Sequence, residues 1–164
     1  MDTNPMTSKQ INDIIFNLKL EFYAKTKPLF PEHAVPKRTY KTATANGLTR
    51  AIMDSGKYLG AHMVRMSNEG RYRPGAVIKT PAGTRRGPGV WLPGTANGIS
   101  DILMTFGGQT YFIEIKIKDK QLPSQKKFET NLQAAGGNYI IIRTFAEFLD
   151  LIDTILNRSS HKLK

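Results

Sequence analysis

The chain has 164 residues, 40% of them hydrophobic, which suffices for one globular domain with a packed core and excludes a fully disordered chain. It contains no cysteine, no apolar run of membrane-spanning length and no signal-peptide-like start, which predicts a cytoplasmic protein without disulfides or a membrane partner. Lys and Arg outnumber Asp and Glu by 24 to 13, and the charge of +11 favours nucleic acid as a partner, although an acidic protein would suit the same charge.

Residues 1–44 are expected to form a helix followed by an extended arm. Thr7 and Gln10 have the spacing of a capping box, and apolar residues then recur at helical intervals to about residue 24. The prolines that follow favour an extended chain over residues 25–45. Beyond it, the pattern predicts a helix over 46–59, strands over 62–67, 99–105, 110–118 and 138–143, and helices beginning at Pro123 and after the Thr144–Glu147 capping box. This order predicts an α/β core.

Residues 80–98 are rich in glycine and proline and are predicted to form an irregular loop. A loop of this length in a small domain is usually either functional or disordered. Arg85, Arg86 and Trp91 within it suit phosphate contacts and stacking on bases or sugars. The alternative is that Trp91 simply pins the loop to the core.

Gly107 and Gly108 have the pattern of a two-residue turn that joins two strands into a hairpin. Counting back from this turn places Asp101 directly opposite Glu114, with Lys116 as the diagonal neighbour of the aspartate. Because side chains alternate between faces, these three polar residues share one face of the hairpin. The other face is apolar and carries Ile102, Met104, Tyr111, Ile113, Ile115 and Ile117.

Two facing carboxylates repel each other, so a raised pKa, a nearby lysine or a bound divalent cation must offset the repulsion. Mg²⁺ is typically held by one or two carboxylates together with substrate phosphates, and in a basic protein this combination indicates phosphodiester hydrolysis. Lys116 would then stabilise charge on the phosphate or orient the attacking water. The alternative is an ion-pair patch on a solvent-exposed sheet face, because a D…ExK pattern is frequent in sequences.

The stretch GISDILMTFGGQTYFIEIKIKDKQ and the helix after it resemble the core of the PD-(D/E)XK nucleases, closest to the VRR-NUC and Holliday-junction-resolvase-like group. The resemblance is specific over residues 98–152 and weaker over residues 46–97. It implies a restriction-endonuclease-like fold, with a central mixed sheet flanked by helices.

The same resemblance assigns roles to individual residues. It implies a Mg²⁺ or Mn²⁺ site in which Asp101, Glu114 and the main-chain carbonyl of Ile115 are ligands, with Lys116 as the catalytic lysine. It also implies that Gln125 approaches the site from the start of its helix. The helical pattern independently turns Gln125 toward the sheet, where its alternative role is to cap the helix or to bond a strand end.

One departure from the family concerns the first core helix, where many members carry a metal-binding Glu. The matching segment NGLTRAIMDSG has none, so Asn46 serves as a weaker ligand, Glu69 is recruited, or the position is unused. The segment VRMSNEG resembles a family segment that carries an Arg and an Asn. By this resemblance, Arg65 and Asn68 are expected to contact substrate or to order the site. The residues expected to bind nucleic acid are Arg65, Asn68, Arg71, Arg73, Arg85, Arg86, Lys118 and Lys120.

Taken together, the sequence predicts a metal-dependent DNA endonuclease domain over residues 45–157, followed by a basic tail over residues 158–164. The resolvase-like resemblance implies a homodimer that acts on branched DNA such as four-way junctions. No phosphate loop of the form GxxxxGK[ST] occurs, so no nucleotide cofactor is expected. The alternatives are a non-cleaving DNA-binding module with the same fold and an accessory subunit that binds an acidic protein.

Overall fold

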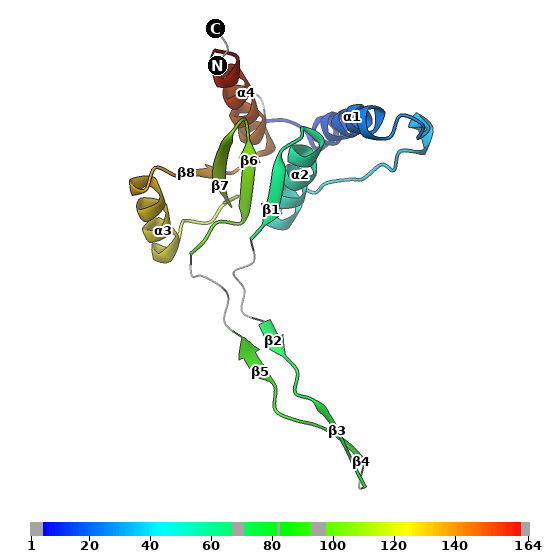
Figure 1. Ribbon diagram of the computed structural model, residues 1–164, viewed down its shortest axis with the longest axis vertical. Coiled ribbons are helices and arrows are strands. Elements are labelled where there is room, and N and C mark those ends of the chain that lie inside the picture. Colours follow the sequence, from blue (N-terminus) through cyan, green and yellow to red (C-terminus); the bar gives the residue numbers. More distant parts are fainter. Residues whose placement is uncertain (1–4, 67–70, 82, 93–97, 162–164) are drawn as a thin grey trace.

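The body of the protein is built on one four-stranded mixed sheet (Figure 1). The structure, a computed structural model, describes residues 5–66, 71–81, 83–92 and 98–161. The strands of the sheet are arranged in the order β1 (His62–Arg65), β6 (Ile102–Phe106), β7 (Gln109–Ile115) and β8 (Asn138–Ile142). The β1–β6 and β6–β7 pairs are antiparallel, while β8 runs parallel to β7. This mixed sheet and its flanking helices confirm the predicted α/β class.

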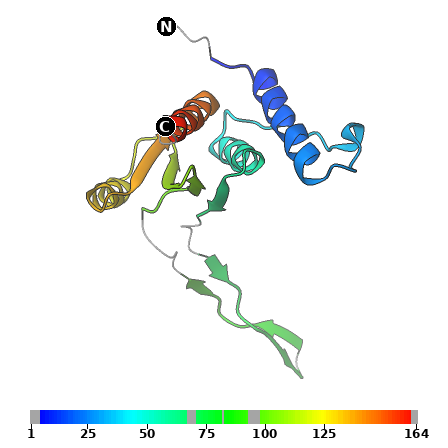
Figure 2. The same cartoon turned by 45° about the horizontal axis from the view of Figure 1, so that its top comes forward.

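Helices cover both faces of the sheet. On one face, α2 (Ala45–Tyr58) and α4 (Phe145–His161) pack against β6, β7 and β8. On the other face, α3 (Pro123–Ala134) packs through Phe128, whose ring lies 5.6 Å from that of Phe112 in β7. Helix α1 (Ser8–Thr26) lies outside α2, farther from the sheet (Figure 2). None of the described helices is both long and apolar enough to cross a membrane.

The main hydrophobic core lies between the sheet and the α2–α4 face. Leu48 and Ile52 of α2 and Phe148 of α4 are fully buried against Ile102 and Ile113 of the central strands. The predicted apolar face of the hairpin is confirmed here, because its members in β6 and β7 are buried. The buried face of α2 follows the helical period of its apolar residues, as the amphipathic pattern requires.

The N-terminal region is tied to this core. Thr7 caps α1 and forms the predicted capping box with Gln10. The segment between α1 and α2 contains a short 3₁₀ helix, η1 (Glu32–Ala34), and ends in the buried Tyr40. The main-chain N–H of Tyr40 donates to Asn12 Oδ1 at 2.7 Å, and its hydroxyl donates to Asp54 Oδ2 at 2.7 Å. These bonds anchor the connecting segment to both α1 and α2.

The prediction of an irregular loop over residues 80–98 is wrong for residues 83–92, which the structure describes. Two short two-stranded sheets form instead: β2 (Arg71–Arg73) pairs with β5 (Val90–Leu92), and β3 (Val77–Thr80) pairs with β4 (Gly83–Arg86). Valine, isoleucine and tryptophan favour extended backbone, and they outweigh the glycines and prolines, which fall mainly between the paired segments. Residues 71–81 and 83–92, here named the basic ribbon, extend away from the body (Figure 1).

Candidate active site

The hairpin of β6 and β7 sets the geometry of the site. Its pairs run from Phe106 opposite Gln109 down to Ile102 opposite Ile113, which is the predicted register. Gly107 and Gly108 have φ angles of 58° and 74°, as a two-residue turn with two positive φ angles requires. Asp101 immediately precedes the last pair, so the count of residues places it beside Glu114 at the end of the ladder.

Asp101 is fixed by bonds to both neighbouring strands. Its side-chain Oδ2 accepts the main-chain N–H of Ile115 at 2.8 Å. Its main-chain carbonyl accepts the N–H of Met66 at 2.8 Å, which continues the pairing of β1 with β6 by one more bond. The aspartate is half-buried at this position. Its carboxylate is therefore held at the end of β7 rather than free to rotate into solvent.

Glu114 lies in the interior, beneath the start of α3. Only 2% of the residue is exposed, and its Oε1 receives the Lys116 ammonium at 3.2 Å and a hydrogen bond from Gln125 Nε2. The Lys116 side chain is itself only 12% exposed. A solvent-exposed ion-pair patch does not describe this arrangement, because both partners are withdrawn from water. A buried carboxylate of this kind needs partners for both of its oxygens.

The second oxygen of Glu114 has no such partner. Oε2 is buried and makes no hydrogen bond to any of the described residues. Burial, and after it the negative charge of Asp101, raise the pKa of Glu114 to about 7 against the opposing effects of Lys116 and Gln125. An uncompensated buried carboxylate oxygen costs roughly 1–3 kcal/mol or more, so a positively charged ligand at Oε2 would relieve both the repulsion and the missing contact.

A divalent cation fits these residues. Asp101 and Glu114 supply two carboxylates at one end of β7, and Mg²⁺ is commonly held by one or two carboxylates with water and phosphate oxygens completing its shell. Within residues 5–66, 71–81, 83–92 and 98–161, no group of three or more His, Asp or Glu residues could hold a metal. The remaining ligands of a cation would therefore come from main chain, water or substrate.

Gln125 joins the start of α3 to this centre. Its Oε1 accepts the N–H of Leu122 at 2.9 Å, which closes the first turn of the helix, while its Nε2 donates to Glu114. The predicted orientation of Gln125 toward the sheet is confirmed. One side chain both caps α3 and bonds a residue at the end of β7. The amide thus positions the glutamate while it caps the helix.

Gly98 allows the chain before Asp101 to pass close to α3. Its φ of 84° lies in the left-handed region, and a Cβ there would lie 2.8 Å from the main-chain nitrogen of Gln125 and closer still to the carbonyl of Ser124. Only glycine accepts both the conformation and the approach. The motif Gly98-Ile99-Ser100-Asp101 therefore brings the aspartate to the site and leaves room for the helix that carries Gln125.

Asn46 and Arg65 contact each other at the edge of the site. Arg65 ends β1, paired with Ile102, and its Nη2 donates to Asn46 Oδ1 at 3.0 Å. The pair therefore lies one residue from Asp101 along the ladder. The amide oxygen of Asn46, considered above as a replacement ligand, is engaged by this arginine. Glu69 and Asn68 lie outside the described residues.

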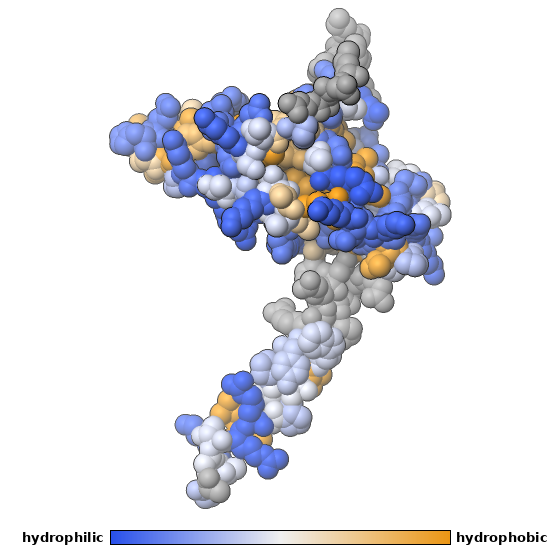
Figure 3. Space-filling model, turned by 180° about the vertical axis from the view of Figure 1, so that it is seen from behind, coloured by the Kyte–Doolittle hydropathy of each residue, from blue (hydrophilic) through white to orange (hydrophobic). Residues whose placement is uncertain are grey.

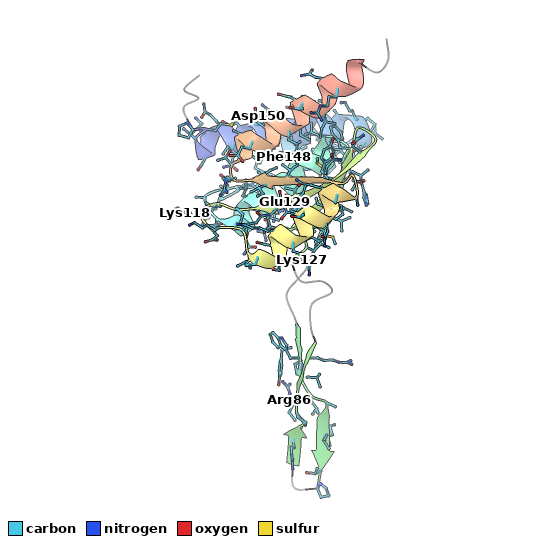
Figure 4. All side chains as sticks on the ribbon, turned by 90° about the vertical axis from the view of Figure 1, so that its left-hand side faces the viewer. Arg86, Lys118, Lys127, Glu129, Phe148 and Asp150 are labelled. Atoms are coloured by element: carbon cyan, nitrogen blue, oxygen red, sulfur yellow. The ribbon has the colours of Figure 1, made fainter. Side chains whose placement is uncertain are left out.

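The remaining basic residues fall into two groups. Lys118 and Lys120 are exposed just beyond the end of β7, and Figure 4 shows Lys118 at the edge of the body. Arg86 lies on the basic ribbon, away from the body that carries Lys118 (Figure 4). The sequence predicts that all of these residues bind nucleic acid. The structure brings together Asp101, Glu114, Lys116 and Gln125, with the N–H of Ile115 and with Arg65 nearby. It places the other arginines on the basic ribbon: Arg71, Arg73, Arg85 and Arg86.

Two residues near the site were missed from the sequence. Arg143 donates from Nη1 to the carbonyl of Lys116 at 3.4 Å. Tyr139 is buried, and burial raises its pKa to about 12, an effect to which the charge of Glu114 adds. The parallel pairing of β7 with β8 explains both positions. Recognising that the apolar strand over residues 138–143 runs beside β7 would have predicted them.

Comparisons of the chain with protein-family models, with curated protein sequences and with solved structures gave no match. The geometry of the site and its chemistry are therefore the basis for assigning a function.

Proposed function

We propose that the protein is a metal-dependent endonuclease that hydrolyses phosphodiester bonds of DNA at Asp101, Glu114 and Lys116. The single observation that carries this proposal is the buried Glu114, whose Oε2 lacks a partner among the described residues while Asp101 lies beside it. Two carboxylates and a largely buried lysine side chain at one end of β7 are costly for the stability of the metal-free protein. The same combination can hold a divalent cation and stabilise an anionic phosphate.

The residues divide the chemistry among themselves. Asp101 and Glu114 would hold Mg²⁺ or Mn²⁺, with the carbonyl of Ile115 as a further ligand by resemblance to the PD-(D/E)XK nucleases. The cation supplies an activated water and neutralises charge on the phosphate. Lys116 places a second positive charge next to Glu114, 3.2 Å from its Oε1, where it stabilises an anionic phosphate in the transition state. Gln125 keeps the glutamate oriented from the side of α3.

Charge supports DNA as the substrate. The chain carries a net charge of +11, Arg65 pairs with Ile102, the residue after Asp101, and Lys118 and Lys120 are exposed just beyond the end of β7. Such cations contact the phosphate backbone and hold the duplex in register over the site. The restriction-endonuclease-like fold, the homodimer and the preference for branched DNA are proposed from the resemblance to resolvase-like nucleases.

A non-cleaving DNA-binding module is the second candidate. It is favoured by Asn46, which stands in the first core helix where the resembled family carries a metal-binding Glu, and whose oxygen is taken by Arg65. A protein that had lost catalysis would keep its surface charge and lose the metal. The two candidates therefore agree on DNA binding and differ in cleavage.

A cleavage panel separates them. Labelled linear, nicked and four-way-junction DNA is incubated with the protein in Mg²⁺, Mn²⁺ or chelator, beside Asp101→Ala and the control Asp153→Ala, an exposed acid on α4. The proposal predicts metal-dependent cutting that is lost in Asp101→Ala and retained in the control. Binding to all three DNAs without any cutting in either metal would favour the non-cleaving module, and a failure to bind DNA at low salt would exclude both.

A further inference from the structure

The basic ribbon has an unusual composition for a part of a globular protein. Residues 71–92 contain five Lys and Arg residues and no Asp or Glu. None of the described ribbon residues belongs to the hydrophobic core of the body. The segment therefore contributes little to the packing of the body.

Large apolar side chains of the ribbon are exposed. Tyr72 and Trp91 face each other across the β2–β5 pair, with ring centroids 6.2 Å apart, and they are 54% and 66% exposed. Trp91 thus does not pin a loop to the core. Farther out, Val77 and Ile78 are 56% and 50% exposed on successive positions of β3, hence on opposite faces. Hydrophilic and hydrophobic residues lie side by side along the ribbon (Figure 3).

The ribbon is also narrow. At the break between the two strand pairs, the N–H of Gly87 donates to the carbonyl of Ala76 at 2.9 Å. Gly75 lies so close to the main chain of Gly87 and Pro88 that a Cβ could not be accommodated. Two strands about 4.8 Å apart with short cross-links form a ribbon that exposes side chains on both faces. A partner that covers both faces at once must be a groove rather than a flat surface.

We propose that the basic ribbon inserts into a groove of the duplex that flanks the cleavage site, an inference that rests on the proposed function for its choice of DNA. The major groove is about 12 Å wide and admits a two-stranded β ribbon. Residues 71–80 extend to roughly 33 Å at most, about one turn of B-form DNA. Arg85 and Arg86 then contact phosphates on the groove walls, while Ile78, Val77 and the Tyr72–Trp91 pair contact bases and sugars.

Charge selects DNA over a second copy of the chain. A copy carries the same charge of +11 and the same acid-free ribbon, so ribbon-to-ribbon contact is repulsive. DNA offers dense negative charge on both walls of a groove with flat apolar base edges between them. The ribbon offers the complementary alternation, because Arg86 pairs with Val77 and Arg85 pairs with Ile78 in its register.

The test measures binding in chelator, where no cleavage can occur. Affinity for a 40-bp duplex is measured from 50 to 300 mM salt for the wild type, for Arg85→Gln/Arg86→Gln, and for Lys25→Gln/Lys57→Gln as a control of equal charge change. Lys25 and Lys57 are exposed in the last turns of α1 and α2, far from the N-terminal turn of α2 beside the site. The ribbon variant should lower the slope of log K against log salt by about 2 and the control by much less.

Duplex length supplies the second arm. The affinity difference between wild type and Arg85→Gln/Arg86→Gln should vanish when the duplex on each side of the binding centre is trimmed below about 10 bp, one helical turn. It should also be absent on single-stranded DNA of equal length. A thermal melt that matches the wild type shows that the variant is folded.

The outcomes distinguish the two proposals. Equal losses on single-stranded and duplex DNA, an unchanged salt slope, or a fall in sedimenting mass from dimer to monomer in the ribbon variant would each overturn the groove contact. If the ribbon variant behaves as expected but the wild type never cuts DNA in Mg²⁺ or Mn²⁺, the groove contact stands and the proposed nuclease activity fails. If the wild type cuts DNA and the ribbon variant binds it as the wild type does, the proposed nuclease activity stands and the groove contact fails.

Discussion

At the scale of single residues, Glu114 is both the most unfavourable charge of the site and its main candidate for a cation ligand. Its carboxylate is withdrawn from water, repelled by Asp101 and only partly compensated by Lys116 and Gln125. A side chain in that position lowers the stability of the metal-free protein when it ionises. In the proposed centre, the same features would favour a bound cation, because a cation would supply the missing partner of Oε2.

Glu114 should make the stability of the metal-free protein depend on pH. Its pKa is raised from 4.5 to about 7 on folding, so the folded state binds the proton more tightly, and this contribution is full below pH 4.5 and lost as pH rises through 7. Glu114→Gln should therefore remove on the order of 1–3 kcal/mol of the fall in unfolding free energy between pH 5 and pH 8. Urea unfolding in chelator at both pH values measures it. Parallel pH dependence in the two proteins would contradict the burial of this carboxylate.

Gln125 should act as a positioning residue for the metal ligand. Gln125→Ala removes the donor to Glu114, and the loss of such supporting contacts typically weakens metal binding by 10–100-fold. Gln133→Ala, an exposed glutamine on the same helix, is the matched control. Calorimetric titration with Mn²⁺ measures both. Equal affinities in the two variants would show that Gln125 serves only to cap α3.

At the scale of elements, the site depends on how closely the chain before β6 approaches α3. Gly98 controls that approach, since its left-handed φ and its contact with the start of α3 both exclude a side chain. Asp101 and Gln125 reach Glu114 from these two elements. A shift of either element by about 1 Å is enough to impair positioned catalysis.

Alanine substitutions at Gly98 and Gly136 separate the cost of backbone strain from the cost of a clash with α3. Gly136 has a φ of 81°, close to that of Gly98, but a Cβ there meets no atom within 4 Å. Gly136→Ala should therefore cost about 1 kcal/mol from backbone strain, and Gly98→Ala about 1–3 kcal/mol more from the clash with α3. Chemical denaturation compares the free energies of unfolding. Equal losses would mean that the approach of Gly98 to α3 is not tight.

Elements with a clear local pattern were predictable from the sequence. The capping box of α1, the Gly107-Gly108 turn and the alternation in β6 and β7 each follow from residues close together in the chain, and the hairpin register then placed Asp101 beside Glu114. The burial of Glu114 was not predictable in this way, because it depends on α3 crossing the polar face of the hairpin. The ribbon was missed because glycine and proline were given more weight than its β-branched residues.

At the scale of the whole molecule, the chain consists of a packed body and a basic ribbon that extends from it (Figure 1). The body contains the main core and the carboxylates, whereas the ribbon carries charge and exposed aromatic side chains without a core of its own. In this account chemistry belongs to the body, and the ribbon adds contacts to flanking DNA. The two parts should therefore be separable by deletion.

Replacement of residues 71–92 by a short Gly-Ser linker tests this separation. Because the described ribbon residues contribute nothing to the hydrophobic core cluster, the unfolding free energy of the body should change by less than about 0.5 kcal/mol. Cutting of DNA should persist, with reduced affinity for long duplexes and unchanged affinity for duplexes that extend less than about 10 bp to each side. A loss of several kcal/mol, measured by urea unfolding, would show that the ribbon is part of the folding unit.

The central claim is that Lys116 and the two carboxylates beside it form a metal-dependent phosphodiesterase centre. It is tested most directly by the single-turnover rate of DNA cleavage in Mg²⁺ and Mn²⁺ for the wild type, Lys116→Ala and the exposed control Lys127→Ala. The account predicts cutting that requires metal, falls at least about 10²-fold in Lys116→Ala and is nearly unchanged in Lys127→Ala. Equal rates in Lys116→Ala and the wild type, or cutting that persists in chelator, would contradict it.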